Sequence, residues 1–241
     1  MKILAVVPVI SAHTADVCIP SMLREDSSFG LKPEEILLVD NSREGWAGKY
    51  GLNTYRDPDN HQLGVARAWN IGAQQVLNEG IDYLIVVSTS MLFGPDLHTT
   101  WRRQMETFEG SNIIENSGNS WHLTAIHRAM FERVGLFDSN FYPYAIEQID
   151  WCRRLHVLGL EGGWPKPWVN AMSTGVAAHN MIVSTPAGPL LRYYEDKWNG
   201  PKGEEKWDRP WGDKDLSYFE DVPIPVLAER YGLGEYGVGW W

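Results

Sequence analysis

Apolar and polar positions follow two different patterns along the chain. Short runs such as Tyr83–Ser88 are apolar almost throughout, whereas the stretches between them repeat apolar residues every three or four positions, as a helix does. The first half therefore predicts a β-α-β-α-β-α order, and the second half is less regular. The expected strands cover Lys2–Val9, Glu35–Asp40, Leu52–Tyr55, residues 82–88, Asn112–Glu115 and Leu123–His127. The expected helices cover Asp16–Arg24, Gly64–Leu77, Pro95–Phe108, Arg128–Val134, Ile146–Leu158 and Pro189–Trp198.

Small polar residues follow two of the predicted strands, Asp40-Asn41-Ser42 after one and Ser88 after the next apolar run. Open α/β sheets build ligand crevices at such strand ends. Between the two strands, residues 60–72 join a turn to a helix. Gly64 there permits close approach of a ligand to the backbone, the helix N-terminus offers N–H groups to an anion, and Arg67 adds a cation. The stretch favours a phosphate site, although an ordinary helix can open in the same way.

Composition limits the class of protein. The 241 residues are 44% hydrophobic and carry a formal net charge of −10, which is typical of a soluble globular domain and disfavours nonspecific binding of nucleic-acid backbone. The cysteines, Cys18 and Cys152, lie far apart, which favours two reduced thiols. No apolar run is long enough to span a bilayer, and the start MKILAVVPVI resembles a buried strand more than a signal peptide. We expect a cytoplasmic protein.

Tryptophan is abundant, with 12 residues in the chain. Those beyond residue 195 are Trp198, Trp207, Trp211, Trp240 and Trp241. Clustered aromatics stack on sugars or bases, but they also attach an irregular segment to a core, and we favour the second role here.

The order of motifs resembles the family 2 glycosyltransferases, and more weakly their bacterial and phage-type members. The resemblance covers nearly the whole chain, and five segments in order are more specific than any one of them. These segments are the first apolar strand, Val39-Asp40-Asn41-Ser42, residues 60–72, Phe131–Asp138 and Glu147–Arg154.

The resemblance implies a GT-A fold, a Rossmann-like mixed sheet flanked by helices, with a Trp-rich C-terminal extension. Residues 1–184 are then a single domain, of which 1–110 hold a nucleoside-diphosphate sugar and 111–184 face the acceptor, while 185–241 form a C-terminal helix and extension. The implied activity is transfer of the sugar, with inversion, to a hydroxyl acceptor. The acceptor class stays open among saccharide, protein, lipid and modified DNA.

The resemblance assigns one group of residues to binding of the sugar donor. Asp40 and Asn41 match the nucleoside site, Pro8 and Val9 line the base, and Arg67 and Asn70 stand near the diphosphate. Ordinary turn chemistry offers an alternative, because Asp40-Asn41-Ser42 can also cap a loop.

The family's metal-binding Asp-x-Asp is replaced here by Ser88-Thr89-Ser90, whose neutral hydroxyls are poor ligands for Mn²⁺ or Mg²⁺. Either a divalent ion is held weakly through water and phosphate, or none is used and cations such as Arg67 replace it. The three hydroxyls remain candidates for binding ribose or phosphate. His179 matches the family's late histidine, so it is a candidate metal or diphosphate ligand, although a structural role is equally open.

The family's catalytic base falls on Gln148, and an amide cannot act as a base. Glu147 and Asp150 remain, and their spacing of three places them on one helix face. We favour Glu147, because Asp150 has Arg154 as an ion-pair partner four residues on.

Loss of both motifs also fits a second hypothesis, a catalytically silent GT-A binding module. A nucleotidyltransferase is disfavoured, because the residues after the first strand lack the required Gly-rich loop with a cation.

Overall fold

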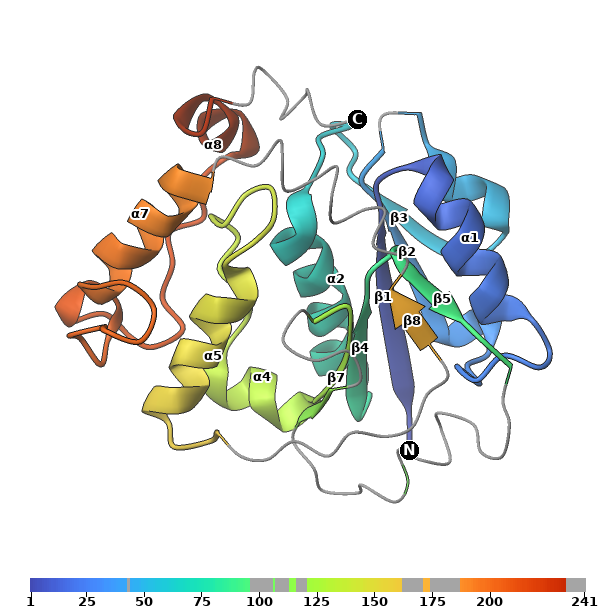
Figure 1. The fold of residues 1–241 in the computed structure, drawn as a ribbon, viewed down its shortest axis with the longest axis horizontal. Helices are drawn as coiled ribbons and strands as arrows, with labels where there is room; N and C mark the ends of the chain where they lie inside the picture. The colour runs from blue at the N-terminus through green and yellow to red at the C-terminus, as the bar shows by residue number, and fades with distance from the viewer. Residues whose placement is uncertain are drawn as a thin grey trace.

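The computed structural model describes residues 1–42, 44–95, 106, 113–115, 121–161, 171–173 and 187–232. Among these residues, six strands form one mixed sheet in the order β3-β2-β1-β4-β7-β6 (Figure 1). Strands β1 to β4 run parallel, and β7 is antiparallel to both of its neighbours. The strands are β1 (Ile3–Val9), β2 (Ile36–Asp40), β3 (Asn53–Arg56), β4 (Tyr83–Val87), β6 (Ile113–Glu115) and β7 (Leu123–His127), and a separate pair joins β5 (Met91–Phe93) to β8 (Ala171–Ser173).

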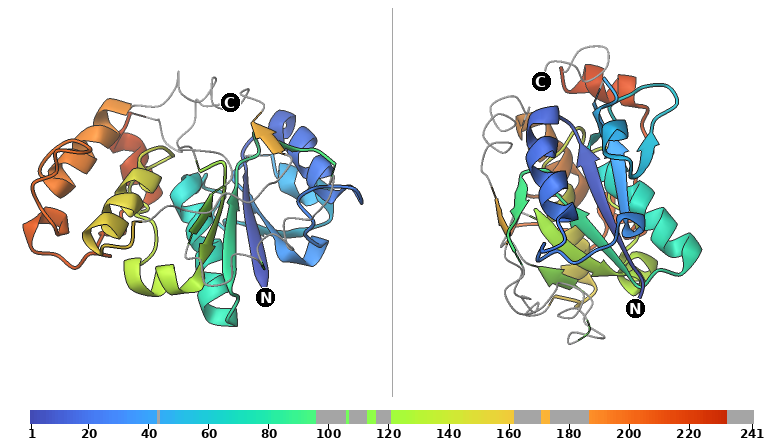
Figure 2. Two further views of the ribbon diagram at one scale, coloured as in Figure 1. Left: turned by 60° about the horizontal axis from the view of Figure 1, so that its bottom comes forward. Right: turned by 90° about the vertical axis from the view of Figure 1, so that its right-hand side faces the viewer.

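Helices cover both faces of this sheet (Figure 2). The helices are α1 (Ala12–Leu23), α2 (Gly64–Glu79), α4 (Arg128–Val134), α5 (Glu147–Val157), α7 (Ala187–Trp198) and α8 (Ile224–Arg230), with 3₁₀ turns at Pro33–Glu35, Trp46–Tyr50 and Pro210–Gly212. No helix in the described ranges is both long enough and apolar enough to span a membrane.

Successive residues of β1 point to opposite faces of the sheet, so the strand serves two cores. Ile3, Ala5 and Val7 belong to the cluster beneath α1, whereas Leu4 and Val6 belong to the larger cluster beneath α2. Both sets are buried, which explains why the strand is apolar throughout.

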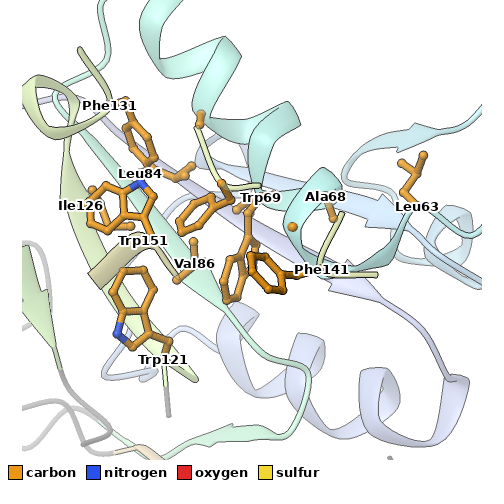
Figure 3. Packing of buried hydrophobic residues seen from close by; sticks show 14 of the residues in the cluster. Leu63, Ala68, Trp69, Leu84, Val86, Trp121, Ile126, Phe131, Phe141 and Trp151 are labelled. Atoms are coloured by element: carbon orange, nitrogen blue, oxygen red, sulfur yellow. The ribbon is translucent and has the colours of Figure 1, made fainter. Parts of the chain in front are cut away.

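Aromatic rings dominate the larger core and join α2 to α5 (Figure 3). Trp121, just before β7, lies with its ring 5.6 Å from that of Trp151 on α5. Phe137 lies 5.5 Å from Trp151 and 5.1 Å from Trp69 on α2. The second half of the chain is thereby fixed to the sheet through ring contacts.

The C-terminal segment is attached by Trp198, the last residue of α7. Its side chain is fully buried and its indole N–H donates to Asp150 on α5 at 2.8 Å. The amide of Trp207 returns to the Trp198 carbonyl, and Arg153 donates to the Trp207 carbonyl at 3.0 Å. These contacts show the attaching role expected for this part of the tail, whereas Trp240 and Trp241 lie outside the described residues.

Some element boundaries differ from the expectation. Helix α1 begins at Ala12 rather than Asp16, because Ser11 caps it by accepting from the Thr14 N–H. The expected helix at 95–108 falls almost entirely outside the described residues. Strands β5 and β8 were not expected, since three residues are too few to establish a periodic pattern.

Candidate active site

Glu147 opens α5 and is almost completely buried, with 3% of its surface exposed. Its Oε2 atom finds no hydrogen-bond partner in the part of the chain that the structure describes. Burial raises the pKa of this carboxyl to about 8, so it is largely protonated at neutral pH. A buried, unpaired carboxyl with a pKa near neutrality is the property expected of a catalytic acid or base.

The backbone before Glu147 is strained. Ala145 and Ile146 have φ angles of 77° and 73°, in the left-handed region that β-branched residues such as Ile rarely occupy. Such strain concentrates where surrounding structure must aim a functional side chain. Here it sets the direction in which the chain enters α5, and therefore the place of Glu147.

Asp150, one turn later, is also buried but fully paired. Its carboxylate accepts from Arg154 Nη2, Lys197 Nζ and the Trp198 indole, each at 2.8 Å. Burial acts to raise its pKa, but the two cations outweigh burial and hold the pKa of Asp150 below its ordinary value. Lys197 also contacts Asp138 at 2.8 Å, so two carboxylates and two cations form one buried network.

Two further buried polar groups near Glu147 lack partners among the described residues: the side-chain oxygen of Gln148 and the hydroxyl of Tyr142. Unpaired buried polar groups are rare and costly, so several within seven residues call for an explanation such as a ligand. Within the described chain, the segment 142–148 therefore combines the titratable carboxyl of Glu147 with neighbouring buried polar atoms that lack hydrogen-bond partners.

The start of α2 faces this segment. Gly64 has a φ of 76°, and a Cβ built there would lie 2.6 Å from the Pro143 carbonyl oxygen. The same carbonyl accepts from the Val65 N–H at 2.7 Å, and Asn41 accepts from the Leu63 N–H at 3.0 Å. The expectation of N–H groups free for an anion is therefore wrong for these two amides, because the protein's own oxygens occupy them.

Arg67 and Asn70, expected near the diphosphate, bind other parts of the protein. Arg67 Nη2 donates to the Val222 carbonyl at 2.5 Å and lies 3.0 Å from the Asp221 carboxylate, while its Nε is buried without a partner among the described residues. The Asn70 amide exchanges two hydrogen bonds with the Phe137 backbone, at 2.8 and 2.9 Å. Among the described residues Arg67 Nε thus stays unpaired, and Asn70 serves to hold the backbone at Phe137.

The strand ends expected to hold the nucleoside lie together at one edge of the sheet. Pro8 and Val9 end β1 and are buried, and the Val9 carbonyl accepts from the Asn41 N–H at 2.8 Å. The Asn41 side chain bridges to α2, donating to the Gly64 carbonyl at 3.2 Å and accepting from Leu63. Both polar atoms of that side chain are therefore used.

Asp40 is buried at the end of β2, where its carboxylate organises the following loop. It accepts from the N–H and the hydroxyl of Ser42 at 3.0 and 2.5 Å, and from the Ala47 N–H at 3.4 Å. Arg56 Nη1 lies 3.3 Å from its second oxygen. The loop-capping alternative is thus realised in these contacts.

The Ser-Thr-Ser turn follows β4 and forms a network of neutral groups. The hydroxyls of Ser88 and Ser90 lie 2.8 Å apart, Ser90 lies 3.3 Å from His122 Nδ1, and Thr89 lies 3.0 Å from the Thr14 hydroxyl. Burial lowers the pKa of His122, which keeps its imidazole neutral at pH 7. The position of His122 just before β7, the antiparallel partner of β4, brings its ring to this turn.

This turn does not fit a tightly held Mg²⁺ or Mn²⁺, since such ions require anionic oxygens and these hydroxyls are neutral and bonded to one another. His179 lies outside the described residues. A group of possible ligands, Asp57, Asp59 and His61, follows β3, and there Asp57 already pairs with His61 at 3.1 Å.

A pocket opens between the strand ends, the start of α2 and the segment 143–144, with about 250 Å³ of empty space that includes volume open to solvent. It is lined by Ile10, Asn41, Gln62, Gly64, Val65, Pro143 and Tyr144. Of the expected donor residues it includes Asn41. The pocket thus lies between the first part of the chain and the segment leading to Glu147.

Neither a scan of protein-family models nor a search of curated proteins finds a match to this sequence. Solved structures do match. One is the mannosyltransferase PcManGT from Pyrobaculum calidifontis in complex with GDP-Man and Mn²⁺, which is 12% identical with a TM-score of 0.51 over 75% of this chain and 60% of its own. Another is a Drosophila β-1,4-galactosyltransferase 7 variant with manganese, UDP-Gal and xylobiose, 11% identical with a TM-score of 0.43 over 69% of this chain and 65% of its own.

The first of these likenesses is strong enough to assign architecture. At 12% identity it concerns the fold alone, and the chain matches less than two thirds of that protein's length. The part of this chain that the structure describes has a mixed sheet of parallel strands extended by antiparallel ones, with helices on both faces. The chain therefore has the GT-A fold.

Proposed function

We propose that the protein is an inverting glycosyltransferase of the family 2 type, which moves a sugar from a nucleoside-diphosphate donor to a hydroxyl acceptor. The observation that carries the proposal is Glu147, a buried carboxyl with an unpaired oxygen and a pKa of about 8 at the head of α5 in a GT-A fold. The family's catalytic base falls on Gln148, and Glu147 is the adjacent carboxylate that we propose takes over its role.

Glu147 is the proposed general base. The acceptor oxygen attacks the anomeric carbon as the bond to the diphosphate breaks. The acceptor proton passes to Glu147 in the molecules whose carboxyl is ionised, a fraction that grows as pH rises toward 8. A carboxylate whose pKa is raised toward 8 binds that proton more tightly than an ordinary glutamate does. Asp150 is unsuited to this role, because its oxygens are held by Arg154, Lys197 and Trp198.

Donor binding is proposed to be independent of a divalent ion. Charge on the leaving diphosphate must be stabilised, and preorganised neutral donors can supply part of that stabilisation. The hydroxyls of Ser88, Thr89 and Ser90 are candidates, together with the Nε of Arg67. The nucleoside is proposed to lie at the edge formed by Pro8, Val9, Asp40 and Asn41.

A calorimetric titration with a panel of nucleoside diphosphates and their sugars, in Mn²⁺ and in EDTA, tests the donor site. Binding that survives EDTA supports the proposal. Binding only with Mn²⁺ overturns metal independence. Absence of binding in both conditions favours the alternative, a silent GT-A binding module, which the replacement of both family motifs also fits.

Glu147→Gln tests the chemical step. We expect the variant to lose transfer, and donor hydrolysis if that is used as the assay, by at least about 100-fold, because general-base contributions are of this order. Donor affinity stays within a factor of two or so, since the amide keeps the shape of the side chain. Glu132→Gln, on the exposed face of α4, is the matched control. Equal loss of binding and turnover in Glu147→Gln contradicts the assignment.

A further inference from the structure

The pocket beside α2 has apolar walls. Ile10, Val65 and Pro143 contribute aliphatic surface, and Tyr144 adds a ring on the side of the second half. Surfaces of this kind favour a flat, uncharged group over a phosphate, whose charge requires donors or cations. The occupant must still satisfy any polar atom on the wall.

The polar side chains around this pocket differ in whether their hydrogen-bonding atoms already have partners. Asn41 uses both side-chain atoms on Leu63 and Gly64, and the neighbouring Asp40 directs its carboxylate to the loop after β2. Gln62 differs: it is only 7% exposed, and its side-chain nitrogen is buried without a partner among the described residues. A buried amide that lacks a partner destabilises the free protein. A ligand that supplies the missing partner would remove that cost.

We infer that Gln62 is the specificity-determining residue of the donor pocket, where its carboxamide pairs with the hydrogen-bonding edge of the nucleobase. This inference rests on the proposed function and identifies the side chain that reads the base. A carboxamide presents a donor and an acceptor side by side, which suits the edge of a base. The apolar walls would then cover the faces of the ring.

The inference gives Gln62 a different role from that of the residues expected at the nucleoside. Asp40 and Asn41 shape the site through the loop and α2, whereas Gln62 contacts the ligand. Substitution of Gln62 by Met keeps the length of the side chain and removes its polar atoms. Since no described contact is lost, the free variant should fold and melt a few degrees above the wild type.

The test compares the affinities of UDP, GDP, ADP and CDP for the wild type, for Gln62→Met and for Gln74→Met, whose residue is exposed on α2, the helix that follows Gln62. The four ligands share ribose and diphosphate, so their differences report the base alone. We expect the wild type to prefer one base, Gln62→Met to weaken that ligand by roughly five- to tenfold and bring the four affinities together, and Gln74→Met to match the wild type.

Several results overturn the inference while leaving the proposed function intact. These are wild-type affinities that do not depend on the base, an unchanged preference in Gln62→Met, or an equal loss for all four ligands. A lower melting temperature in Gln62→Met would also overturn it, because it would reveal a structural partner for the amide. If the wild type binds none of the four ligands in Mn²⁺ or in EDTA, the proposed function itself fails and the inference fails with it.

Discussion

Glu147 and Asp150 lie one turn apart on α5, are both buried, and have opposite electrostatic surroundings. Asp150 faces two cations and an indole N–H, whereas Glu147 has an oxygen without a hydrogen-bond partner in the described chain. Burial therefore costs free energy at both carboxylates, but ion pairs and hydrogen bonds offset that cost only at Asp150. This difference separates a structural carboxylate from a candidate catalytic one.

The raised pKa of Glu147 predicts how stability changes with pH. The unfolded chain ionises this group near 4.5 and the folded chain near 8, so the folded protein binds the extra proton between these values. Stability is then fully retained below about pH 4.5 and lost as pH rises toward 8, at up to about 1.4 kcal/mol per pH unit. Urea denaturation of the wild type and Glu147→Gln across this range should show the wild type falling relative to the variant. Parallel curves would contradict the raised pKa.

The sequence alone predicted both carboxylates and the Arg154 partner of Asp150, because residues three and four apart share a helix face. It could not predict Lys197 or Trp198 at Asp150, since these come from α7, more than 45 residues further along the chain. The use of Asp40 by its own loop is a local relation, and the sequence did offer it as an alternative. Spacing along the chain predicts contacts within one element, but not contacts between elements that are far apart in the sequence.

At the scale of elements, α2 and the segment before α5 fit together through Gly64. The positive φ and the 2.6 Å approach of the Pro143 carbonyl both depend on the missing side chain. Gly64 was expected to admit a ligand, and it admits Pro143 instead. The close contact joins α2 to the segment that leads to Glu147.

Gly64→Ala should therefore be destabilised by about 1–3 kcal/mol, from backbone strain and displacement of the 142–143 segment. Thermal or urea unfolding measures the loss. Gly48→Ala is the control, because nothing lies within 4 Å of the Cβ it would add. Similar stability of both variants would show that the two segments are not tightly apposed.

Helix α7 depends on Lys197, whose ammonium lies between Asp138 and Asp150. Lys197→Met leaves two buried carboxylates short of a cation and should cost about 3–5 kcal/mol in urea unfolding. Lys206→Met, at an exposed position nearby, should change stability by no more than a few tenths of a kcal/mol. A cost below 1 kcal/mol for Lys197→Met would mean that the ammonium is not confined there.

For the whole molecule, the described C-terminal segment closes over the second half of the fold. Arg67 on α2 holds Asp221 and Val222, and Asn140 accepts from the Val222 N–H at 3.3 Å and donates to the Glu220 carbonyl. The resemblance placed Arg67 at the diphosphate. Its observed partners add a second task, the attachment of a segment 155 residues away.

Arg67→Ala should loosen this segment and speed its cleavage by chymotrypsin after Tyr218 or Phe219. Mass spectrometry of timed digests identifies the cut, and Arg192→Ala, exposed on α7, provides the comparison. Equal rates in the two variants would assign the attachment to Asn140 and its neighbours instead.

The architecture as a whole followed from the sequence more fully than its sites did. Apolar runs such as the one at 82–88 predicted strands, and in the sheet Tyr83–Val87 is buried and pairs in parallel with β1, as a strand covered on both faces does. The short pair β5 and β8 lacked enough residues to show a pattern. His122 reaches Ser90 through strand pairing between β4 and β7, a relation that periodicity does not encode.

The buried network of Asp138, Asp150, Arg154 and Lys197 contains equal numbers of opposite charges beneath the surface. Dissolved ions screen charges that water reaches, but they have little access to groups that are 0% exposed. An exposed pair such as Arg24 and Asp26 weakens as ionic strength rises. The anchorage of α7 should therefore persist in molar salt, where surface ion pairs no longer contribute to holding a protein together.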